Sequence, residues 1–281
     1  MRPKKLQVAA VQMKFRPTIA ENVQRIIQRI RSAARCGADV ILFPECAVTG
    51  YRREFPGLKP DPVSRGCAQI ACAARDARCN VLVGSPTFQD GAWHNSVLVF
   101  NRRGREVFRY SKIHLTEWDA RFFVPGNSPA FFRVDGVPAT AIICHERRFP
   151  ELVRLPVMMG AQIVFHPNAG LDLLAASRAK RGGRDGIAVR AFENQVFYVF
   201  ANSVGPQGSG LWSAGDSKIV APDSRVLALA NNREEVIIRA ELDLAAAVRW
   251  YAREALRQPA FLRAAWRHML TLCRRQLRNC L

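Results

Sequence analysis

The chain has 281 residues, of which 49% are hydrophobic and 23% are charged, a composition typical of a folded globular protein. A chain of this length buries a large core without disulfides or a structural metal, so explanations that apply to small stapled scaffolds are excluded. Its 42 Lys and Arg against 23 Asp and Glu give a formal net charge of +19, which by itself favours nucleic acid or acidic surfaces as partners.

The basic residues are dispersed along the chain, singly or in pairs such as those at 52–53 and 147–148. Dispersed charge is more typical of a compositional bias than of a binding stripe, so we expect no nucleic-acid partner. No apolar run approaches the ~20 residues of a membrane span, and the first residues lack the apolar core of a signal peptide. The eight cysteines lack the spacing of a disulfide framework. We therefore expect a cytoplasmic protein without membrane association.

The first part of the chain alternates between strand and helix patterns. Residues 6–13 are rich in branched apolar side chains and predict a buried strand. Apolar residues at helical spacing over 19–37 predict a helix that ends at Gly37, and 40–43 predict a second strand. A Pro-Glu pair follows this strand. The loops beyond the carboxyl ends of strands are where open α/β sheets place their chemistry.

The alternation continues downstream, and strands outnumber helices. Helices are predicted at 64–77, 151–159 and 186–194, and strands at 81–83, 96–100, 107–110, 139–143, 163–166, 197–201, 218–220, 226–229 and 236–242. Turn signals such as Arg103-Gly104 and Asp135-Gly136 separate neighbouring strands. This excess of strands favours a layered α/β sandwich with two sheets. The glycine-rich segment 205–210 has neither dinucleotide nor phosphate-loop spacing, so it is predicted to be a mobile loop.

Residues 245–281 differ in composition from residues 1–244, which we expect to form one domain. From Arg249 onward the extension carries eight arginines and one acidic residue, with large apolar residues interleaved. This pattern predicts two basic amphipathic helices that are separated near Pro259. Such helices lie on membranes, bind partner helices or pack on their own domain. The aromatic residues of the extension, Trp250, Phe261 and Trp266, favour packing on this domain or on a partner subunit.

Three ionisable residues, Glu45, Lys112 and Cys144, each lie just beyond a predicted strand, and Cys144 also precedes a predicted helix. A cysteine in such a turn is held beside exposed backbone N–H groups and a helix N-terminus, which favour a thiolate and an oxyanion. Each residue alone has an ordinary explanation, as a loop cap, a solvated strand end or a small buried hydrophobe. Their joint occurrence, each within a specific local string, makes those explanations insufficient.

A series of short strings accompanies these residues, namely VAAVQM (8–13), ADVILFPE (38–45), TGY (49–51), HNS (94–96), YSKIHL (110–115), FFVPG (122–126), ICHERRFPEL (143–152), RAFEN (190–194), AN (201–202) and GDSKIVAP (215–222). In content and order they resemble the nitrilase superfamily, the carbon-nitrogen hydrolases, from about residue 6 to residue 244. The resemblance implies a four-layer α-β-β-α sandwich with two mixed sheets. It also implies a Glu-Lys-Cys catalytic set, no metal and no organic cofactor.

Carried over residue by residue, the catalytic set is Glu45, Lys112 and Cys144. The chemistry of these groups agrees, because a thiolate that forms an acyl-enzyme divides the slow hydrolysis of an amide into two easier steps. We expect Glu45 to take the thiol proton, pass it to the departing amine and then activate water. We expect Lys112 and the N–H groups around Cys144 to hold the oxyanion.

The chain departs from the family pattern at one position. Members commonly carry a second glutamate ahead of the FFVPG string, where it orients the substrate amide and the lysine. The matching position here is Asp119, which is one methylene shorter, whereas Glu117 lies two residues earlier. The register to residues 122–126 favours Asp119. The shorter side chain predicts either a backbone moved inward or a water that fills the gap.

Tyr51, His145 and Asn168 are the expected substrate-binding residues, with a structural role as the alternative for His145. The string around Cys144 resembles the amidase and carbamoylase branches more than true nitrilases, which usually have Cys-Trp-Glu. We therefore expect hydrolysis of small linear amides or N-carbamoyl compounds with release of ammonia, and nitrile hydrolysis is the enzymatic alternative.

A catalytically idle nucleic-acid or acidic-partner binding protein on the same scaffold is the alternative from another class. The complete catalytic set argues against it, because a binding protein is free to lose those residues. The family resemblance and the aromatic extension also predict a homodimer or a larger homo-oligomer.

Overall fold

The computed structural model describes residues 5–51, 55, 57–179 and 186–279, which form two six-stranded sheets and one three-stranded sheet. The first sheet contains β1 (Lys5–Gln12), β2 (Val40–Leu42), β3 (Asn80–Gln89), β4 (Ala92–Phe100), β5 (Glu106–Ser111) and β15 (Val236–Asp243). The second contains β6 (Phe132–Val134), β7 (Val137–Ala141), β8 (Ile163–Asn168), β10 (Phe197–Asn202), β13 (Lys218–Val220) and β14 (Val226–Leu229). The third contains β9 (Asp172–Leu173), β11 (Val204–Gly208) and β12 (Leu211–Ala214).

Parallel strands form the centre of each six-stranded sheet. In the first sheet β1, β2 and β3 are parallel neighbours, and in the second sheet β7, β8 and β10 are. Antiparallel strands complete both sheets toward their edges. Carboxyl ends of parallel strands meet at one edge of a sheet, which is where ligands bind in α/β folds. Glu45 follows β2 and Cys144 follows β7, so this topology brings both to such an edge.

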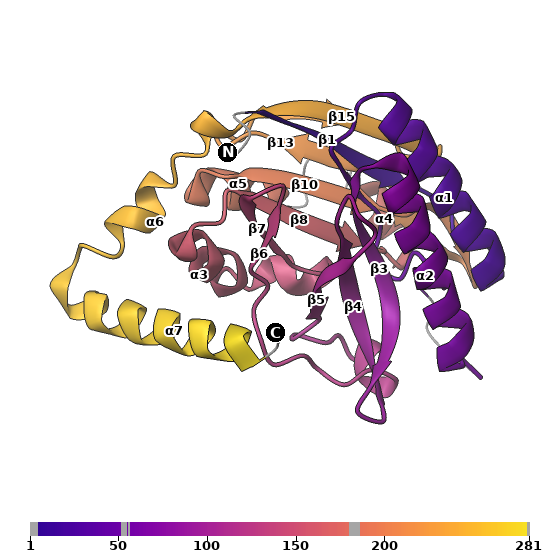
Figure 1. Cartoon of the computed structure of the whole chain (residues 1–281), viewed down its shortest axis with the longest axis horizontal. Coiled ribbons are helices and arrows are strands. Elements are labelled where there is room, and N and C mark those ends of the chain that lie inside the picture. Colours follow the sequence, from indigo (N-terminus) through magenta and orange to yellow (C-terminus); the bar gives the residue numbers. More distant parts are fainter. Residues whose placement is uncertain (1–4, 52–54, 56, 180–185, 280–281) are drawn as a thin grey trace.

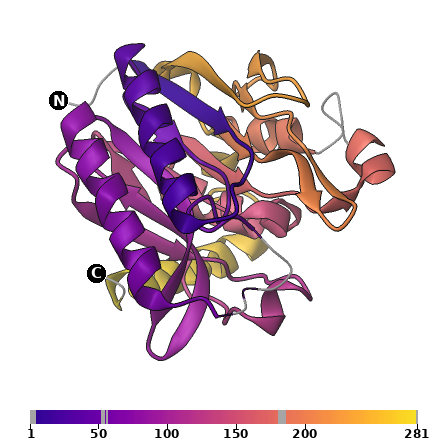
Figure 2. The ribbon, with the colours of Figure 1, turned by 90° about the vertical axis from the view of Figure 1, so that its right-hand side faces the viewer.

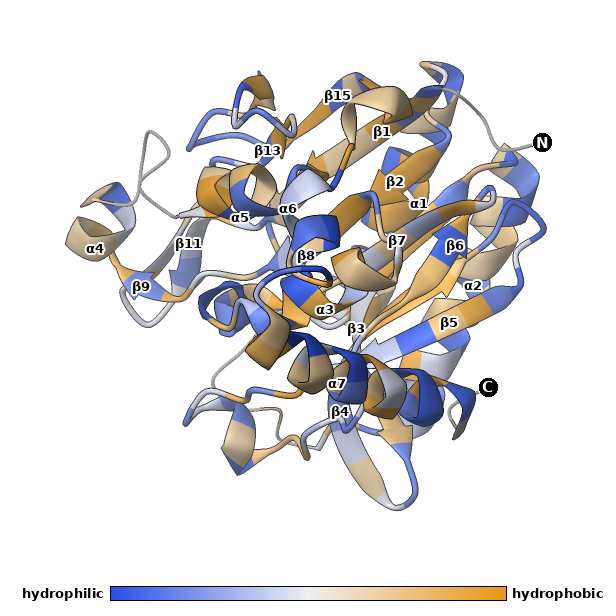
Figure 3. Ribbon diagram, turned by 90° about the vertical axis from the view of Figure 1, so that its left-hand side faces the viewer, coloured by the Kyte–Doolittle hydropathy of each residue, from blue (hydrophilic) through white to orange (hydrophobic). Residues whose placement is uncertain are grey.

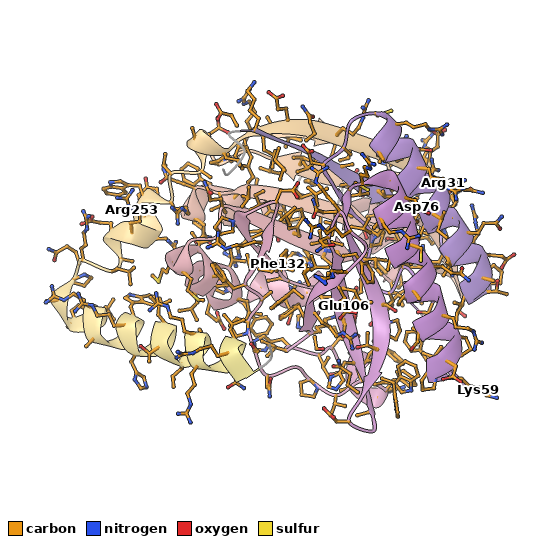
Figure 4. The ribbon with its side chains drawn as sticks, viewed as in Figure 1. Arg31, Lys59, Asp76, Glu106, Phe132 and Arg253 are labelled. Atoms are coloured by element: carbon orange, nitrogen blue, oxygen red, sulfur yellow. The ribbon has the colours of Figure 1, made fainter. Side chains whose placement is uncertain are left out.

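Alternating side chains divide the core into layers. On β1, Leu6, Val8 and Ala10 point between the two sheets, whereas Ala9 and Val11 face the other way, toward helices. The helices α1 (Ile19–Arg35) and α2 (Pro60–Ala77) cover the outer face of the first sheet (Figures 1 and 2). The helices α3 (Glu151–Met159) and α5 (Ile187–Asn194) cover the outer face of the second, and Phe132, labelled in Figure 4, lies in the layer between the sheets. The predicted four-layer α-β-β-α sandwich is confirmed.

Capping residues, glycine and proline explain where the first two helices begin and end. A reciprocal capping box starts α1, because the Thr18 hydroxyl accepts from the Glu21 N–H at 3.2 Å while the Glu21 carboxylate accepts from the Thr18 N–H at 3.1 Å. Gly37 follows its end with a φ of 82°. Helix α2 starts at Pro60, ahead of the predicted start near Ser64, because proline is tolerated in the first turn of a helix.

Several elements were not predicted. The segment 205–210, predicted to be a mobile loop, instead belongs to the hairpin of β11 and β12, so that prediction is wrong. Pro206 and three glycines conceal its strand character, since these residues are depleted in strands. Strand β6, the two-residue strand β9 and the helix α4 (Leu174–Ala179) were missed because segments this short carry little periodicity.

The extension forms α6 (Trp250–Glu254) and α7 (Ala260–Asn279), on either side of Pro259 as predicted. Ala252 and Leu270 are buried in the cluster that also holds α3, and α7 lies beside α3 in Figures 1 and 3. Trp266 packs against the same cluster, as predicted. Trp250 and Phe261 are 54% and 79% exposed, and their burial by a partner subunit stays a prediction. In the described part of the chain, no helix is both long and apolar enough to cross a membrane.

Candidate active site

Cys144 opens a short 3₁₀ helix, η2 (Cys144–Arg148), directly after the apolar end of β7. Its φ is 52°, in the left-handed region that costs a non-glycine residue of order 1–3 kcal/mol unless the surroundings enforce it. The residue is partly buried and lines a cavity. The nucleophile candidate therefore sits on a tight, strained turn rather than in a regular element.

Glu146 is a functional residue that the sequence analysis missed. Its buried carboxylate accepts hydrogen bonds from the N–H groups of Ile143 and Ile113, each at 2.7 Å, and from the Tyr110 hydroxyl at 2.8 Å. Ile143 precedes Cys144, and Ile113 follows Lys112. Glu146 thus ties the turn that carries the thiol to the segment that carries the lysine. Its place in the string around Cys144 was the available signal.

A buried ion cluster joins three of the predicted residues. The Lys112 Nζ lies 2.9 Å from Glu45 Oε1 and 2.7 Å from Asp119 Oδ2, and all three side chains are fully buried. The amide of Asn95 donates to Glu45 Oε1 at 2.7 Å, and the Ala169 N–H donates to Glu45 Oε2 at 3.0 Å. Breaking a buried, hydrogen-bonded ion pair is costly, so this cluster holds each group in one position.

Asp119, not Glu117, lies in this cluster. Asp119 is 1% exposed, and it begins the 3₁₀ helix η1 (Asp119–Arg121), whereas Glu117 is exposed. Its Oδ2 also accepts from the Thr116 N–H at 3.0 Å, and its Oδ1 accepts from the Tyr51 hydroxyl at 2.8 Å. The direct contact with Lys112 shows that no water is needed to span the missing methylene.

Replacing Asp119 by Ala is expected to lower kcat about 10²-fold, because Lys112 loses a partner that fixes its position. Glu117→Ala provides the matched control and is expected to keep wild-type turnover, since Glu117 is exposed and lies outside the cluster. Steady-state kinetics on both variants measure the difference. An inactive Glu117→Ala variant beside an active Asp119→Ala variant would show that the second carboxylate has been assigned to the wrong residue.

The charges around Cys144 favour a protonated thiol. Burial and, next, the Glu45 carboxylate raise the pKa of Cys144 to about 12, against the opposing effect of Lys112. These effects act against the expectation that the turn favours a thiolate. Cys144 is the first residue of a short 3₁₀ helix, and burial together with a neighbouring carboxylate outweighs the nearby cation. The thiol consequently needs a base at the moment of attack.

Glu45 is suited to that role. Burial raises its pKa, although the charge and hydrogen bond of Lys112 act in the opposite direction. For Lys112 burial lowers the pKa, but Glu45 and other acidic groups more than compensate, and its pKa lies well above the usual value. The cluster at neutral pH thus combines a permanent cation with a carboxylate of increased basicity.

The three predicted substrate-binding residues line one cavity of about 460 Å³ with Cys144. The Tyr51 hydroxyl donates to Asp119, and the Asn168 side-chain N–H₂ donates to the side-chain Oδ1 of Asn202 at 2.8 Å. The ring of His145 lies against Phe149, with centroids 5.6 Å apart. Burial and then the charge of Lys112 lower the pKa of His145 to about 4, so this ring is neutral near pH 7.

The residues that the structure describes include no group of three or more His, Cys, Asp or Glu that could hold a metal ion. The charged residues of the cavity are Arg147, Arg148, Asp172 and Asp216. The basic excess of the whole chain is not gathered here, and Arg31 on α1 and Arg253 on α6 lie on opposite sides of the molecule in Figure 4.

Comparison with known proteins agrees with this geometry. The family model described as carbon-nitrogen hydrolase matches residues 7–252. A nitrilase of Pyrococcus abyssi is 32% identical over 248 residues, which cover 85% of this chain and 90% of that protein. An omega-amidase of Xenopus tropicalis is 28% identical over 251 residues, which cover 85% of this chain and 89% of that protein. A 2-oxoglutaramate amidase of Bacillus subtilis is 30% identical over 215 residues, which cover 74% of this chain and 79% of that protein.

Solved structures show the same fold. A mutant amidase of Nesterenkonia, from the nitrilase superfamily, superposes with a TM-score of 0.80 over 93% of this chain and 97% of that one, at 23% sequence identity. The family model spans most of the sequence and includes all members of the buried cluster as well as Cys144. The resemblance found in the sequence is confirmed, and the chain belongs to the carbon-nitrogen hydrolases of the nitrilase superfamily.

Proposed function

We propose that the chain hydrolyses small linear amides or N-carbamoyl compounds through an acyl-enzyme on Cys144 and releases ammonia. The observation that carries this proposal is the buried cluster in which one lysine bridges Glu45 and Asp119 beside a cysteine at the cavity. The volume of the cavity suits a small substrate. The omega-amidase and 2-oxoglutaramate amidase relatives support amides as the substrate class.

In the first half of the reaction, the Cys144 sulfur attacks the substrate carbonyl carbon while its proton moves to Glu45. The Lys112 ammonium and the His145 N–H stabilise the oxyanion that forms. Collapse of this intermediate breaks the C–N bond, and Glu45 returns the proton to the departing ammonia. The raised pKa of the Cys144 thiol and the raised pKa of Glu45 support this sequence of proton transfers.

In the second half, Glu45 takes a proton from water as the water oxygen attacks the thioester carbonyl. The same two donors hold the second oxyanion, the C–S bond breaks, and the proton returns to the sulfur. Asp119 acts by positioning Lys112. Asn168, whose N–H₂ is held by Asn202, offers its carbonyl oxygen to the substrate amide. Tyr51 contributes by fixing Asp119.

Ammonia release from a panel of linear amides, N-carbamoyl amino acids and nitriles tests the proposal. We expect turnover of amides or N-carbamoyl compounds that exceeds turnover of nitriles. Turnover of nitriles alone would favour the nitrilase alternative, for which the Pyrococcus relative is the supporting observation. Absence of turnover with every class would favour a binding protein on this scaffold.

The pH dependence of kcat/KM is expected to show an acid limb with a midpoint above 4.5. Glu45 must be ionised to accept the thiol proton, and burial raises its pKa above that ordinary value. Activity therefore falls as the pH drops through the raised pKa and is fully present above it. Rates of ammonia release between pH 4 and pH 9 measure this limb. A midpoint below 4.5 would contradict the assignment of Glu45 as the base.

We propose that the chain forms a homodimer or a larger homo-oligomer through the exposed aromatic residues of the extension. Sedimentation of the wild type is expected to show an oligomer, and the double substitution Trp250→Ser with Phe261→Ser is expected to weaken it, because both side chains are largely exposed on this chain. Arg253→Ser is the control, because Arg253 is exposed on α6, the helix that carries Trp250. A monomeric wild type would contradict the proposal.

A further inference from the structure

A buried histidine lies directly behind the nucleophile, and the proposed chemistry does not use it. His166, on β8, is fully buried, and its Nε2 lies 2.8 Å from the carbonyl oxygen of Cys144. Its Nδ1 lies 2.9 Å from the Tyr198 hydroxyl. Tyr198 and Phe200, on β10, face the same outer side of the sheet as His166. Two neighbouring parallel strands thus supply a hydrogen-bonded pair that ends on the backbone of Cys144.

The hydrogen bonds of this pair determine the tautomer of the ring. A carbonyl oxygen only accepts hydrogen bonds, so Nε2 of His166 must carry the proton that it donates to Cys144. The Nδ1 of the neutral ring then has a free lone pair and accepts from the Tyr198 hydroxyl. Burial, followed by the charge of Arg147, lowers the pKa of His166 well below its usual value, which is consistent with a neutral ring. Tyr198 therefore holds the histidine in the form that donates to Cys144.

The geometry of the peptide bond links this contact to the oxyanion. The carbonyl of Cys144 and the N–H of His145 belong to one planar trans peptide unit, so the two groups point in opposite directions. A carbonyl held toward His166 turns the N–H away from β8. Among the described residues outside η2, no acceptor receives a hydrogen bond from that N–H, and His145 lines the cavity.

A second side-chain donor reaches the same carbonyl oxygen, but it is weakly placed. Nη1 of Arg147 lies 3.5 Å from it, at the limit of a hydrogen bond, whereas Nε2 of His166 lies at 2.8 Å. The left-handed φ of Cys144 also means that its peptide is held in a conformation that costs energy. A short hydrogen bond from a fully buried ring is suited to enforcing that orientation.

We propose that His166 and Tyr198 are positioning residues that aim the His145 N–H at the oxyanion by holding the Cys144 carbonyl. The inference rests on the proposed function, because it assumes acyl transfer to Cys144. It makes a specific distinction between two reactions of the same thiol. In both reactions the thiol gives its proton to Glu45 as the sulfur attacks. Acyl transfer then develops an oxyanion on the carbonyl and needs the aimed N–H, whereas alkylation by iodoacetamide displaces iodide and develops no oxyanion.

The test compares these two reactions in the full-length protein. His166→Phe keeps a ring and removes the donor, and it is expected to slow the acylation burst with p-nitrophenyl acetate by about 10- to 100-fold, somewhat less than the loss of a whole oxyanion donor. The rate of Cys144 alkylation, followed by peptide mass mapping, is expected to stay close to that of the wild type. Tyr198→Phe is expected to slow the burst by less, because it removes the donor to Nδ1 of His166 and leaves the donor to the Cys144 carbonyl in place.

His166→Gln serves as the rescue variant, because glutamine carries an N–H₂ as many bonds from the backbone as Nε2 of histidine. It is expected to restore most of the burst that His166→Phe loses. Val164→Ala is the packing control, since Val164 lies on the same face of β8 and contributes only apolar contact. Its burst rate is expected to stay near that of the wild type.

Three results would overturn the inference. The first is a His166→Phe burst rate equal to that of Val164→Ala. The second is an equal loss of the alkylation rate and the acylation rate in His166→Phe. The third is a His166→Gln variant without a burst beside a Tyr198→Phe variant with the wild-type burst rate. If His166→Phe fails to fold, the Tyr198→Phe and His166→Gln variants carry the same comparison. A wild type that acylates Cys144 but hydrolyses no amide would contradict the proposed substrate class alone. A wild type that never acylates Cys144 would overturn both proposals.

Discussion

Replacing Cys144 by Ala is expected to lower amide turnover by about 10⁴-fold or more while leaving the fold intact. The substitution removes the atom that forms the covalent bond, and the remaining Glu45 and Lys112 can only assist direct attack by water. The structural cost is small, because the thiol is a small, partly buried group at a position where Ala and Cys meet the same backbone strain. Ammonia release measures the loss, and thermal unfolding monitors the fold.

A second buried cysteine provides the matched control for this prediction. Cys79 lies in the core cluster between the first sheet and its covering helices, far from the cavity residues in the fold. Cys79→Ala is expected to retain wild-type kcat. The Cys144→Ala variant is expected to bind substrate still, which calorimetry can detect, because the rest of the cavity is unchanged. Turnover by Cys144→Ala comparable to that of Cys79→Ala would mean that another group is the nucleophile.

The sequence predicted the layers well because long elements carry strong periodicity. The apolar stripe of α1 and the branched residues of β1 each identify one element, and their order implies two sheets. Pairing between strands distant in the chain has no such local signal. The register of β1 against β15, from Lys5 opposite Asp243 to Gln12 opposite Val236, depends on contacts that only the folded chain reveals.

The short strings shared with the family predicted the residues of the site, but they did not predict the contacts and pKa shifts of those residues. The positions of Glu45, Lys112 and Asp119 could be expected from the resemblance, but the direct Lys112–Asp119 contact depends on the tight η1 turn. The raised pKa of Cys144 follows from burial, which a linear sequence does not display. His166 ends a predicted apolar strand, and nothing in its neighbours indicates that its ring meets the Cys144 carbonyl.

Replacing Lys112 by Met is expected to lower both activity and stability strongly. Turnover should fall by roughly 10³-fold or more, because the oxyanion loses a donor and Glu45 loses the cation that favours its ionised form. The free energy of unfolding should fall by about 3–5 kcal/mol at neutral pH, the cost of leaving a buried charge without its partner. Here two carboxylates, Glu45 and Asp119, lose the ammonium that they share.

A Lys→Met substitution at an exposed position separates the effects of removing Lys112 on activity and stability from a general loss of positive charge. Lys5 pairs with Glu241 at 2.6 Å, but both side chains are largely exposed to solvent. Lys5→Met is therefore expected to change stability little and activity not at all, because water replaces the lost partner. Urea unfolding of the two variants and the wild type, monitored by circular dichroism, measures the contrast.

The pH dependence of the Lys112→Met deficit identifies its cause. Without the ammonium, burial and mutual repulsion raise the pKa values of Glu45 and Asp119 in the folded state above those in the unfolded chain. A raised carboxyl pKa means that the folded variant binds protons more readily, so its stability loss is smallest at acid pH and grows as the pH rises through the raised values.

In the wild type Lys112 lowers the pKa of Asp119 despite burial, so the contribution of Asp119 is lost as the pH falls. The difference between wild type and variant should therefore narrow from pH 7 toward pH 4. A deficit that stays constant over this range would mean that lost packing, rather than two uncompensated carboxylates, destabilises the variant.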